Sequence, residues 1–255
     1  MRTPQTHTTK MSSAILLLGP PGVGKTTTVT QLPGVYIIEC DNNIDGPTQY
    51  AKRAGLSLDF MYDIPQLEDD GTTVPRAMRF KRVAALVNAA FKNDKVKTIV
   101  IDSLTTFVDF ALDEVRRQVG RKIADGVTNF IDENLQIQDW GAFKTLIKHF
   151  IMTARASGKM IVFLGHVYTD KDDMTQALRE FINCPGSMKE EIAAYFSECW
   201  FQSIEERRTG QGVTYVRQLR TVPRPGQSAL GLKSAVGIGN TFDLDFKKLA
   251  DLLSK

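Results

Sequence analysis

A glycine-rich stretch that ends in lysine and threonine, GPPGVGKT at residues 19–26, carries the clearest chemistry of the sequence. Its glycines let the backbone approach phosphate oxygens with the N–H groups pointing inward. Lys25 is expected to reach the β- and γ-phosphates of a nucleotide, and the Thr26 hydroxyl to ligate Mg²⁺. The helix that these residues open adds the positive end of its dipole. The pattern predicts a phosphate-binding loop for ATP and Mg²⁺, composed of Gly19, Pro20, Pro21, Gly22, Val23, Gly24, Lys25, Thr26 and Thr27.

An acidic residue at the end of the strand pattern KTIVIDS, residues 97–103, is expected to complete the metal site. The carboxylate of Asp102 can hold Mg²⁺ through water, as the second acidic component of such sites does. Asp102 could instead cap the following helix, although Ser103 can fill that role. A phosphate-binding loop needs an acidic partner, so Thr26 and Asp102 are the predicted metal ligands.

Two further strand ends carry candidates for catalysis. In VYIIECDN, residues 35–42, Glu39 and Asp41 lie where a carboxylate can orient or deprotonate an attacking water. Because side chains alternate along a strand, both are expected to face the phosphates; two solvated carboxylates are the alternative. MIVFLGH, residues 160–166, ends in His166, which can sense a γ-phosphate and relay its loss. A hydrogen-bonded surface histidine is the alternative reading of that residue.

Short apolar runs must place these side chains at one edge of a sheet. Each run is continuously apolar, as expected for parallel strands buried on both faces, and the runs cover residues 14–18, 35–38, 98–101 and 160–164. Amphipathic patterns predict helices at Arg76–Phe91, Leu104–Val119, Asp139–Ser157 and Phe242–Leu253. Asp139 is the expected N-cap of the third of these helices, and Gly158 its expected C-cap.

The C-terminal third departs from this alternation. Residues 199–204 and 213–219 flank a turn-rich stretch and predict a β-hairpin. Three segments are expected to be irregular, and such long loops are usually functional or mobile: Gly120–Gln138, Thr169–Met188 and Thr221–Gly239. The predicted fold is α/β, with a mainly parallel central sheet flanked by helices and a β-hairpin extension near the C-terminus.

Length and composition are those of a soluble globular protein. The 255 residues are 42% hydrophobic and 24% charged, and no run approaches the roughly 20 apolar residues of a membrane span. A formal net charge of +3 permits a polyanionic partner without requiring one. The three cysteines lack metal-ligand spacing and fit a reducing compartment. Residues 1–12 are expected to form a flexible N-terminal tail, and residues 13–255 a single domain in the cytoplasm.

The order of these motifs resembles the core of RecA-like P-loop ATPases. More closely, it is similar to the compact phage and prophage nucleotide-binding proteins that are shortened relatives of the RecA recombinase. DWGAFKTLIKHFIMTAR and NCPGSMKEEIAAYFSECWF strengthen the closer resemblance, which covers roughly residues 12–240. It implies that Asp41 activates the water, where RecA has glutamate, and that His166 is the γ-phosphate switch, where RecA has an amide. Lys25, Asp41, Glu39 and His166 are therefore the catalytic candidates.

The resemblance also implies a ring or filament in which basic residues reach a neighbour's ATP. In GLKSAVG, residues 231–237, Lys233 matches such a residue, but Ala235 stands where a second basic residue is expected. Arg220 and Arg224 are possible substitutes. The segment Thr169–Met188, with Phe181 as a possible stacking aromatic, lies where RecA-like proteins place a DNA-binding loop. The segment Gly120–Gln138, with Phe130, is the other candidate. The candidate DNA contacts are Arg116, Arg117, Arg121, Lys122, Lys171 and Arg179, and solvated surface loops are the alternative.

Several functions fit these residues. The first is an ATPase that binds single-stranded DNA in phage recombination or strand annealing, in the bacterial host cytoplasm if phage-encoded. A single-strand-binding protein is a further candidate partner. The main alternative is a hexameric helicase or translocase, which would use the same site. A small-molecule kinase needs an arginine-rich lid, whereas the segment 169–188 is acid-rich. A nucleotide switch with negligible catalysis is the fourth, if Asp41 is badly placed.

Overall fold

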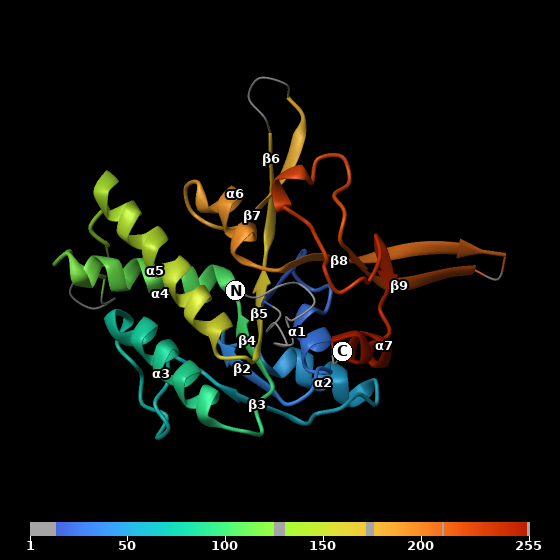
Figure 1. The fold of residues 1–255 in the computed structure, drawn as a ribbon, viewed down its shortest axis with the longest axis horizontal. Helices are drawn as coiled ribbons and strands as arrows, with labels where there is room; N and C mark the ends of the chain where they lie inside the picture. Colours follow the sequence, from blue (N-terminus) through green and yellow to red (C-terminus); the bar gives the residue numbers. More distant parts are fainter. Residues whose placement is uncertain (1–13, 125–130, 172–175, 211, 254–255) are drawn as a thin grey trace, which may run out of the picture.

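An eight-stranded sheet organises the part of the chain that the structure describes (Figure 1). The computed structural model describes residues 14–124, 131–171, 176–210 and 212–253, so the predicted tail at 1–12 lies outside it. The strand order is β10-β9-β8-β1-β5-β4-β2-β3, and neighbours from β8 to β3 are parallel. The strands are β1 (Ala14–Leu18), β2 (Val35–Glu39), β3 (Phe60–Asp63), β4 (Thr98–Asp102), β5 (Met160–Gly165), β8 (Glu198–Thr209), β9 (Gly212–Arg220) and β10 (Thr241–Asp243).

Helices cover both faces of this sheet because its central strands are apolar on both sides. Helices α3, α4 and α5 pack on one face, and α1 and α7 on the other. The α-helices are α1 (Lys25–Val29), α2 (Asp45–Arg53), α3 (Arg79–Lys92), α4 (Leu104–Gln118), α5 (Ile137–Ala156), α6 (Met188–Glu191) and α7 (Phe246–Leu253). Short 3-10 turns lie at Arg76–Met78, Ile192–Tyr195 and Ser228–Leu230. No helix among the described residues is both long and apolar enough to cross a membrane.

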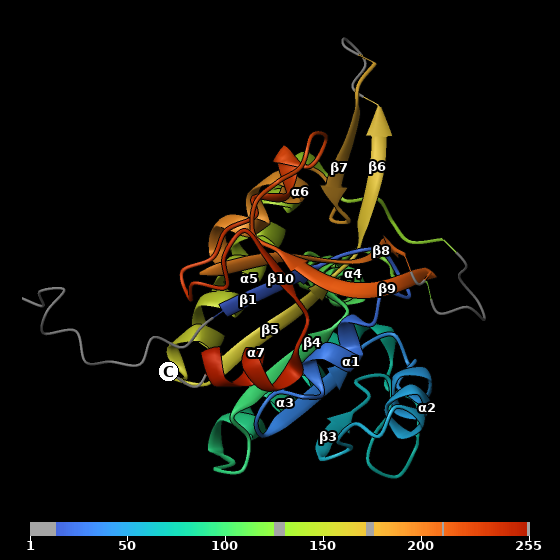
Figure 2. The ribbon, with the colours of Figure 1, turned by 90° about the vertical axis from the view of Figure 1, so that its right-hand side faces the viewer.

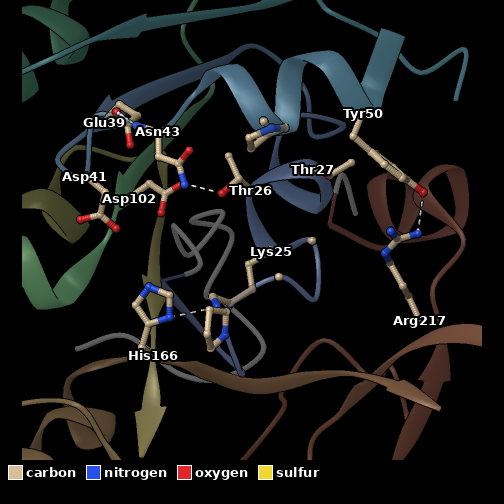
Figure 3. Close-up of a pocket in the computed structure, with 15 residues that line it drawn as sticks. Lys25, Thr26, Thr27, Glu39, Asp41, Asn43, Tyr50, Asp102, His166 and Arg217 are labelled. Carbon is tan, nitrogen blue, oxygen red and sulfur yellow. Dashed lines mark hydrogen bonds between the residues drawn. The ribbon is translucent and has the colours of Figure 1, made fainter. Parts of the chain in front are cut away.

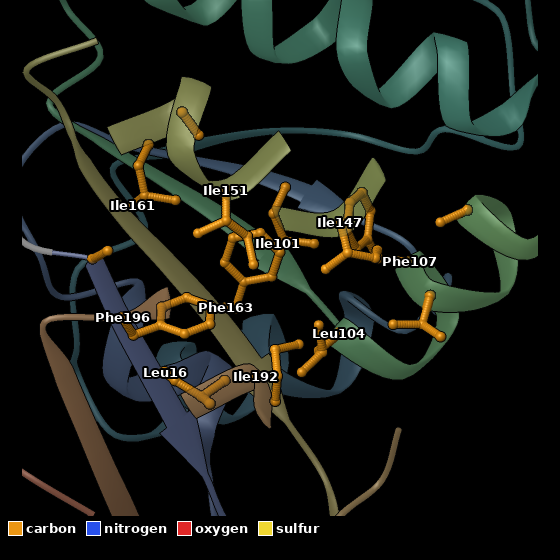
Figure 4. Close-up of a cluster of buried hydrophobic side chains, with 14 of the residues drawn as sticks. Leu16, Ile101, Leu104, Phe107, Ile147, Ile151, Ile161, Phe163, Ile192 and Phe196 are labelled. Atoms are coloured by element: carbon orange, nitrogen blue, oxygen red, sulfur yellow. The ribbon is translucent and has the colours of Figure 1, made fainter. Parts of the chain in front are cut away.

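The larger core cluster centres on an aromatic side chain of β5 (Figure 4). The ring of Phe163 packs edge-on against Phe107 of α4 and against Phe196, with centroid distances of 5.6 and 5.3 Å. All three side chains are almost fully buried. Burial of aromatic side chains of this size gives a large hydrophobic stabilisation. This packing fixes α4 against β5, the two elements that flank Asp102.

Two hairpins extend beyond the sheet. Strands β8 and β9 pair antiparallel from Phe201 to Thr209, and the ribbon projects sideways in Figure 1. Strands β6 (Val167–Lys171) and β7 (Leu178–Ile182) form a separate antiparallel pair that begins directly after His166. Figure 2 shows β6 and β7 rising away from the end of β5.

The segment that follows β9 braces β7. The Glu180 N–H donates to the Gly226 carbonyl over 2.6 Å. Gly226 has φ +83°, and a Cβ there would lie 2.8 Å from the Leu178 carbonyl oxygen, so only glycine allows this approach. The chain therefore runs from β9 directly to a contact with the β6–β7 hairpin.

The structure confirms the predicted fold class. The four apolar runs form β1, β2, β4 and β5, and the hairpin near the C-terminus is present. Their parallel pairing places the ends of β1, β2, β4 and β5 at one edge, where Glu39 pairs with Asp102 in the register of β2 and β4. The site residues that follow these strands are thereby brought to the same edge of the sheet.

Several predicted element boundaries were wrong. The segment 169–188 is not irregular, because it contains the end of β6 and all of β7. Helix α5 starts at Ile137; Gln136 is its N-cap, and Asp139 is the third helical residue, completing a capping box. The first predicted helix begins as a 3-10 turn before α3. The last begins only at Phe246, because residues 241–243 pair with β9.

Candidate functional site

The predicted phosphate-binding loop connects β1 to α1. Gly19 lies so close to Gln202 of β8 that a Cβ would clash with the Gln202 carbonyl oxygen. Gly24 has φ +89°, a left-handed conformation that directs the chain into α1. The side chain of Gln202, which is fully buried, donates to the Val23 carbonyl over 2.9 Å and accepts from the Thr28 hydroxyl over 3.0 Å. Strand β8 thus holds the loop in place from the side.

Lys25 is held by the loop's own carbonyl groups. Its ammonium donates to the carbonyls of Gly19 and Pro20 over 2.8 and 2.9 Å, and its Nζ lies 3.4 Å from His166 Nδ1 (Figure 3). The residue is 7% exposed, and this burial lowers the pKa of Lys25 to about 8, against the raising effect of Asp102 and Asp41. Burial, and then the charge of Lys25, lowers the pKa of His166 as well. A neutral His166 can accept a hydrogen bond from Lys25 at Nδ1.

The two predicted metal ligands lie in direct contact. The Thr26 hydroxyl donates to Asp102 Oδ2 over 2.6 Å, joining the start of α1 to the end of β4. Burial raises the pKa of Asp102 to about 6, although the Thr26 hydrogen bond and Lys25 act in the opposite direction. A hydroxyl and a carboxylate are the oxygen ligands that Mg²⁺ prefers, so the residues present fit this ion.

Glu39 and Asp41 occupy different environments at the end of β2. Glu39 is 2% exposed and accepts a hydrogen bond from the Asn43 N–H over 2.8 Å. Its burial raises the pKa of Glu39 to about 7, with the Asn43 bond acting against that rise. Asp41 is exposed, and its Oδ1 accepts from the hydroxyls of Ser103 and Thr106. Both carboxylates line the same cavity, and the more accessible Asp41 is better placed to meet water.

This cavity of about 300 Å³ gathers residues from β2, β4, β9, α1 and α2, together with His166, which lies between β5 and β6. Two residues that the sequence interpretation missed, Tyr50 and Arg217, lie on the far side of Thr27 from Asp41 in Figure 3. Arg217 of β9 donates to the Tyr50 hydroxyl over 2.8 Å and to the Val23 carbonyl over 3.3 Å. Its guanidinium lies 4.8 Å from the centroid of the Tyr50 ring. An arginine stacked on an aromatic ring offers a planar surface to a base or a ribose.

Comparison with known proteins identifies the family. The model of a family described as an AAA domain matches residues 11–229, which include the phosphate-binding loop, Asp102 and His166. The chain belongs to the AAA domain family. Nucleotide binding at the phosphate-binding loop follows from membership of this P-loop ATPase family.

Solved structures related to this AAA domain are distant. A KaiC-like protein from the hyperthermophilic archaeon Pyrococcus horikoshii is 11% identical, with 82% of this chain and 78% of that chain covered and a TM-score of 0.38. The RadB recombinase is 12% identical, with 88% and 91% covered and a TM-score of 0.44. Neither likeness is close enough to carry an argument about function. No curated protein sequence matches the chain.

The predicted trans-acting residues of the AAA domain differ in their accessibility. Arg220 is 2% exposed; it donates to Gln227 over 2.7 Å and stacks on Phe201, so its charge is used inside its own chain. Arg224 is about half exposed and forms an ion pair with Glu205 over 3.1 Å. The backbone of Lys233 pairs with Cys199, and its side chain is half-buried. Arg224 and Lys233 are therefore the candidates that the geometry leaves accessible.

The predicted DNA contacts also divide into two groups. Three arginines near the end of α4 are engaged with carboxylates: the ion pairs are Arg116–Asp113, Arg117–Glu114 and Arg121–Asp139. Lys122, Lys171 and Arg179 are exposed, the last two on the β6–β7 hairpin. Phe130 lies outside the described residues.

Proposed function

We propose that this AAA domain is a Mg²⁺-dependent ATPase that binds single-stranded DNA as an oligomer, in recombination or strand annealing of the phage type. The observation that carries the proposal is the convergence of Lys25, Thr26, Asp102 and Asp41 on one cavity, with His166 in contact with Lys25. His166 is also the last residue before the β6–β7 hairpin. The site and a projecting hairpin are therefore separated by a single peptide bond.

The side chains of the site have distinct parts in hydrolysis. Lys25 leaves the carbonyls of Gly19 and Pro20 and donates to the phosphates of ATP instead. Thr26 and Asp102 would hold Mg²⁺, which when bound neutralises charge on the phosphate oxygens. Asp41 accepts a proton from the water whose oxygen attacks the γ-phosphorus, and the bond from that phosphorus to the bridging oxygen breaks. ADP and phosphate are the products.

The hairpin after His166 has the features of a single-strand binding surface. Tyr168 and Phe181 stack across the two strands with centroids 5.8 Å apart, and the Lys189 ammonium lies 4.4 Å from the centroid of Phe181. Aromatic rings and cations together bind single strands, because bases stack on the rings while cations attract phosphates. Loss of the γ-phosphate changes the contact between Lys25 and His166, and this change reaches β6 through the backbone.

ATP turnover with single-stranded DNA, with double-stranded DNA and without nucleic acid tests the proposal. We expect single strands to stimulate turnover. The stimulation should fade between about 50 and 200 mM salt, because the affinity carried by contacts between basic side chains and DNA phosphates falls steeply over this range. Lys171→Ala should reduce the salt dependence of binding by about one phosphate contact. Lys247→Ala, an exposed lysine of α7, is the matched control. Equal turnover under all conditions would overturn DNA coupling, and strand separation would favour the helicase alternative.

Arg217→Ala is expected to weaken ATP binding more than it slows catalysis. The substitution removes the stacking on Tyr50 and the bond to Val23, both remote from Asp41. Loss of a cation–π contact of this kind should raise the dissociation constant for ATP roughly two- to thirtyfold. Arg208→Ala, on the same hairpin and 84% exposed, is the control. Titration with a fluorescent ATP analogue measures the change, and a lower kcat at unchanged affinity would contradict this role.

A further inference from the structure

The accessible carboxylate of the site, Asp41, is held by the first turn of helix α4. The Ser103 hydroxyl donates to Asp41 Oδ1 over 3.0 Å, and the Thr106 hydroxyl donates to the same oxygen over 2.5 Å. Asp41 lies beyond the end of β2, so the strand alone does not fix its side chain. Hydrogen bonds to a charged acceptor are short and strong, and two of them on one oxygen restrict rotation of the carboxylate. Oδ2 is left to accept from water.

The Thr106 hydroxyl has no carbonyl of its own helix to bond four positions earlier, because Thr106 is the third residue of α4 and Asp102 precedes the N-cap Ser103. In a helix interior such hydroxyls often bond that carbonyl. The Asp102 carbonyl instead accepts the N–H of Cys40, the residue immediately before Asp41. Thr106 is therefore directed outward to Asp41, while Cys40 ties the same stretch of backbone to β4.

The helix that carries Thr106 is itself fixed against movement. Leu104 and Phe107, on either side of Thr106, are completely buried in the core. Further along the helix, Arg76 bonds both carboxylate oxygens of Asp113 over 3.0 Å. A side chain can position another group only if its own backbone is held in place. The buried residues beside Thr106 and the Arg76–Asp113 contact hold α4 in this way.

We propose that Thr106 is a positioning residue for Asp41, and that its hydroxyl turns Asp41 Oδ2 toward the water that attacks ATP. This inference rests on the proposed ATPase function. A misplaced carboxylate would still leave the phosphate-binding loop and the metal ligands intact. Loss of the Thr106 hydroxyl should therefore lower kcat about ten- to hundredfold and leave the affinity for ATP unchanged.

Three variants of the full chain test this positioning role. Thr106→Val removes the hydroxyl at constant shape, Thr106→Ser keeps it, and Thr105→Val is the control. Thr105 lies on the same turn, but its hydroxyl is directed to the Asn183 carbonyl, 3.5 Å away, and not to Asp41. We expect Thr106→Val to lower kcat at constant KM and Thr106→Ser to restore most of it. Thr105→Val should behave as the wild type.

A double variant separates positioning from a general structural effect. In an Asp41→Asn background, whose turnover is already low, adding Thr106→Val should cause no further loss. An additional loss equal to that in the wild type would overturn the proposal, as would an unchanged kcat in Thr106→Val alone. Wild-type protein that binds ATP without hydrolysing it would overturn the ATPase function and this inference together. Normal wild-type turnover with an unaffected Thr106→Val variant overturns the inference alone.

Discussion

Replacing Lys25 with alanine is expected to reduce ATP turnover by roughly 10²–10³-fold or more, the effect of removing a major donor to the transition state. The same change should weaken ATP binding, because the Lys25 ammonium lies within the loop, hydrogen-bonded to the carbonyls of Gly19 and Pro20. Arginine at this position should not restore activity, since its planar fork does not fit a site built for a compact ammonium. Turnover assays and calorimetric titration with ATP and Mg²⁺ measure both effects.

The control for Lys25→Ala must separate loss of function from loss of folding. Thermal unfolding should show a folded variant, because alanine is compatible with the first turn of α1. Lys95→Ala, at an exposed lysine in the turn before β4, should retain full turnover. Turnover of Lys25→Ala within tenfold of the wild type would mean that the phosphates bind elsewhere.

Asp102→Asn is expected to abolish Mg²⁺-dependent turnover and yet to stabilise the nucleotide-free protein. Asp102 is 8% exposed, and its burial raises its pKa from 3.8 to about 6. The folded protein therefore binds a proton more tightly than the unfolded chain does, and stability falls as the pH rises through this window. At pH 8 the charged carboxylate costs up to roughly 3 kcal/mol, which the neutral amide of asparagine avoids.

The pH dependence of that stabilisation is the sharper part of the test. The gain from Asp102→Asn should shrink as the pH falls from 6 towards 3.8 and vanish well below 3.8, where the carboxyl group is protonated in both states. Denaturant unfolding at about pH 3 and about pH 8 without Mg²⁺ measures the difference. Asp251→Asn, on an exposed face of α7, controls for the change in net charge. A variant that is less stable than the wild type at pH 8 would show that the Asp102 charge is satisfied in the empty site.

The sequence was most informative where strands are buried on both faces. The continuous apolar runs predicted both ends of β1 and the first residue of β4 correctly. The parallel order of the strands then places Asp102 beside the phosphate-binding loop. The β6–β7 hairpin escaped detection because exposed residues form a block at one end of each strand, so its strands lack the alternation of a half-buried strand and the continuous apolar run of a buried one. A pattern of that kind is typical of a solvated loop as well.

Two residues of the site, Arg217 and Thr106, could not be predicted from the sequence because their partners lie far away in the chain. Arg217 is a half-buried residue directly before the three buried residues that end β9. Nothing in the sequence around it marks it as a partner of Val23 and Tyr50. Thr106 belongs to an amphipathic helix in which a hydroxyl is unremarkable by itself. Its meaning comes from the register of β2 beside β4, which brings Asp41 over the first turn of α4.

The short stretch of chain between Arg217 and Gly226 connects the nucleotide cavity to the β6–β7 hairpin, the two sites that the proposed function uses. Arg217 contacts the nucleotide cavity, and the Gly226 carbonyl accepts from Glu180 of the β6–β7 hairpin. A ligand on the hairpin and a nucleotide in the cavity therefore contact opposite ends of the same chain segment, residues 217–226. Linkage between two binding equilibria is reciprocal. If bound ATP changes the affinity for a ligand of the hairpin by some factor, that ligand changes the affinity for ATP by the same factor.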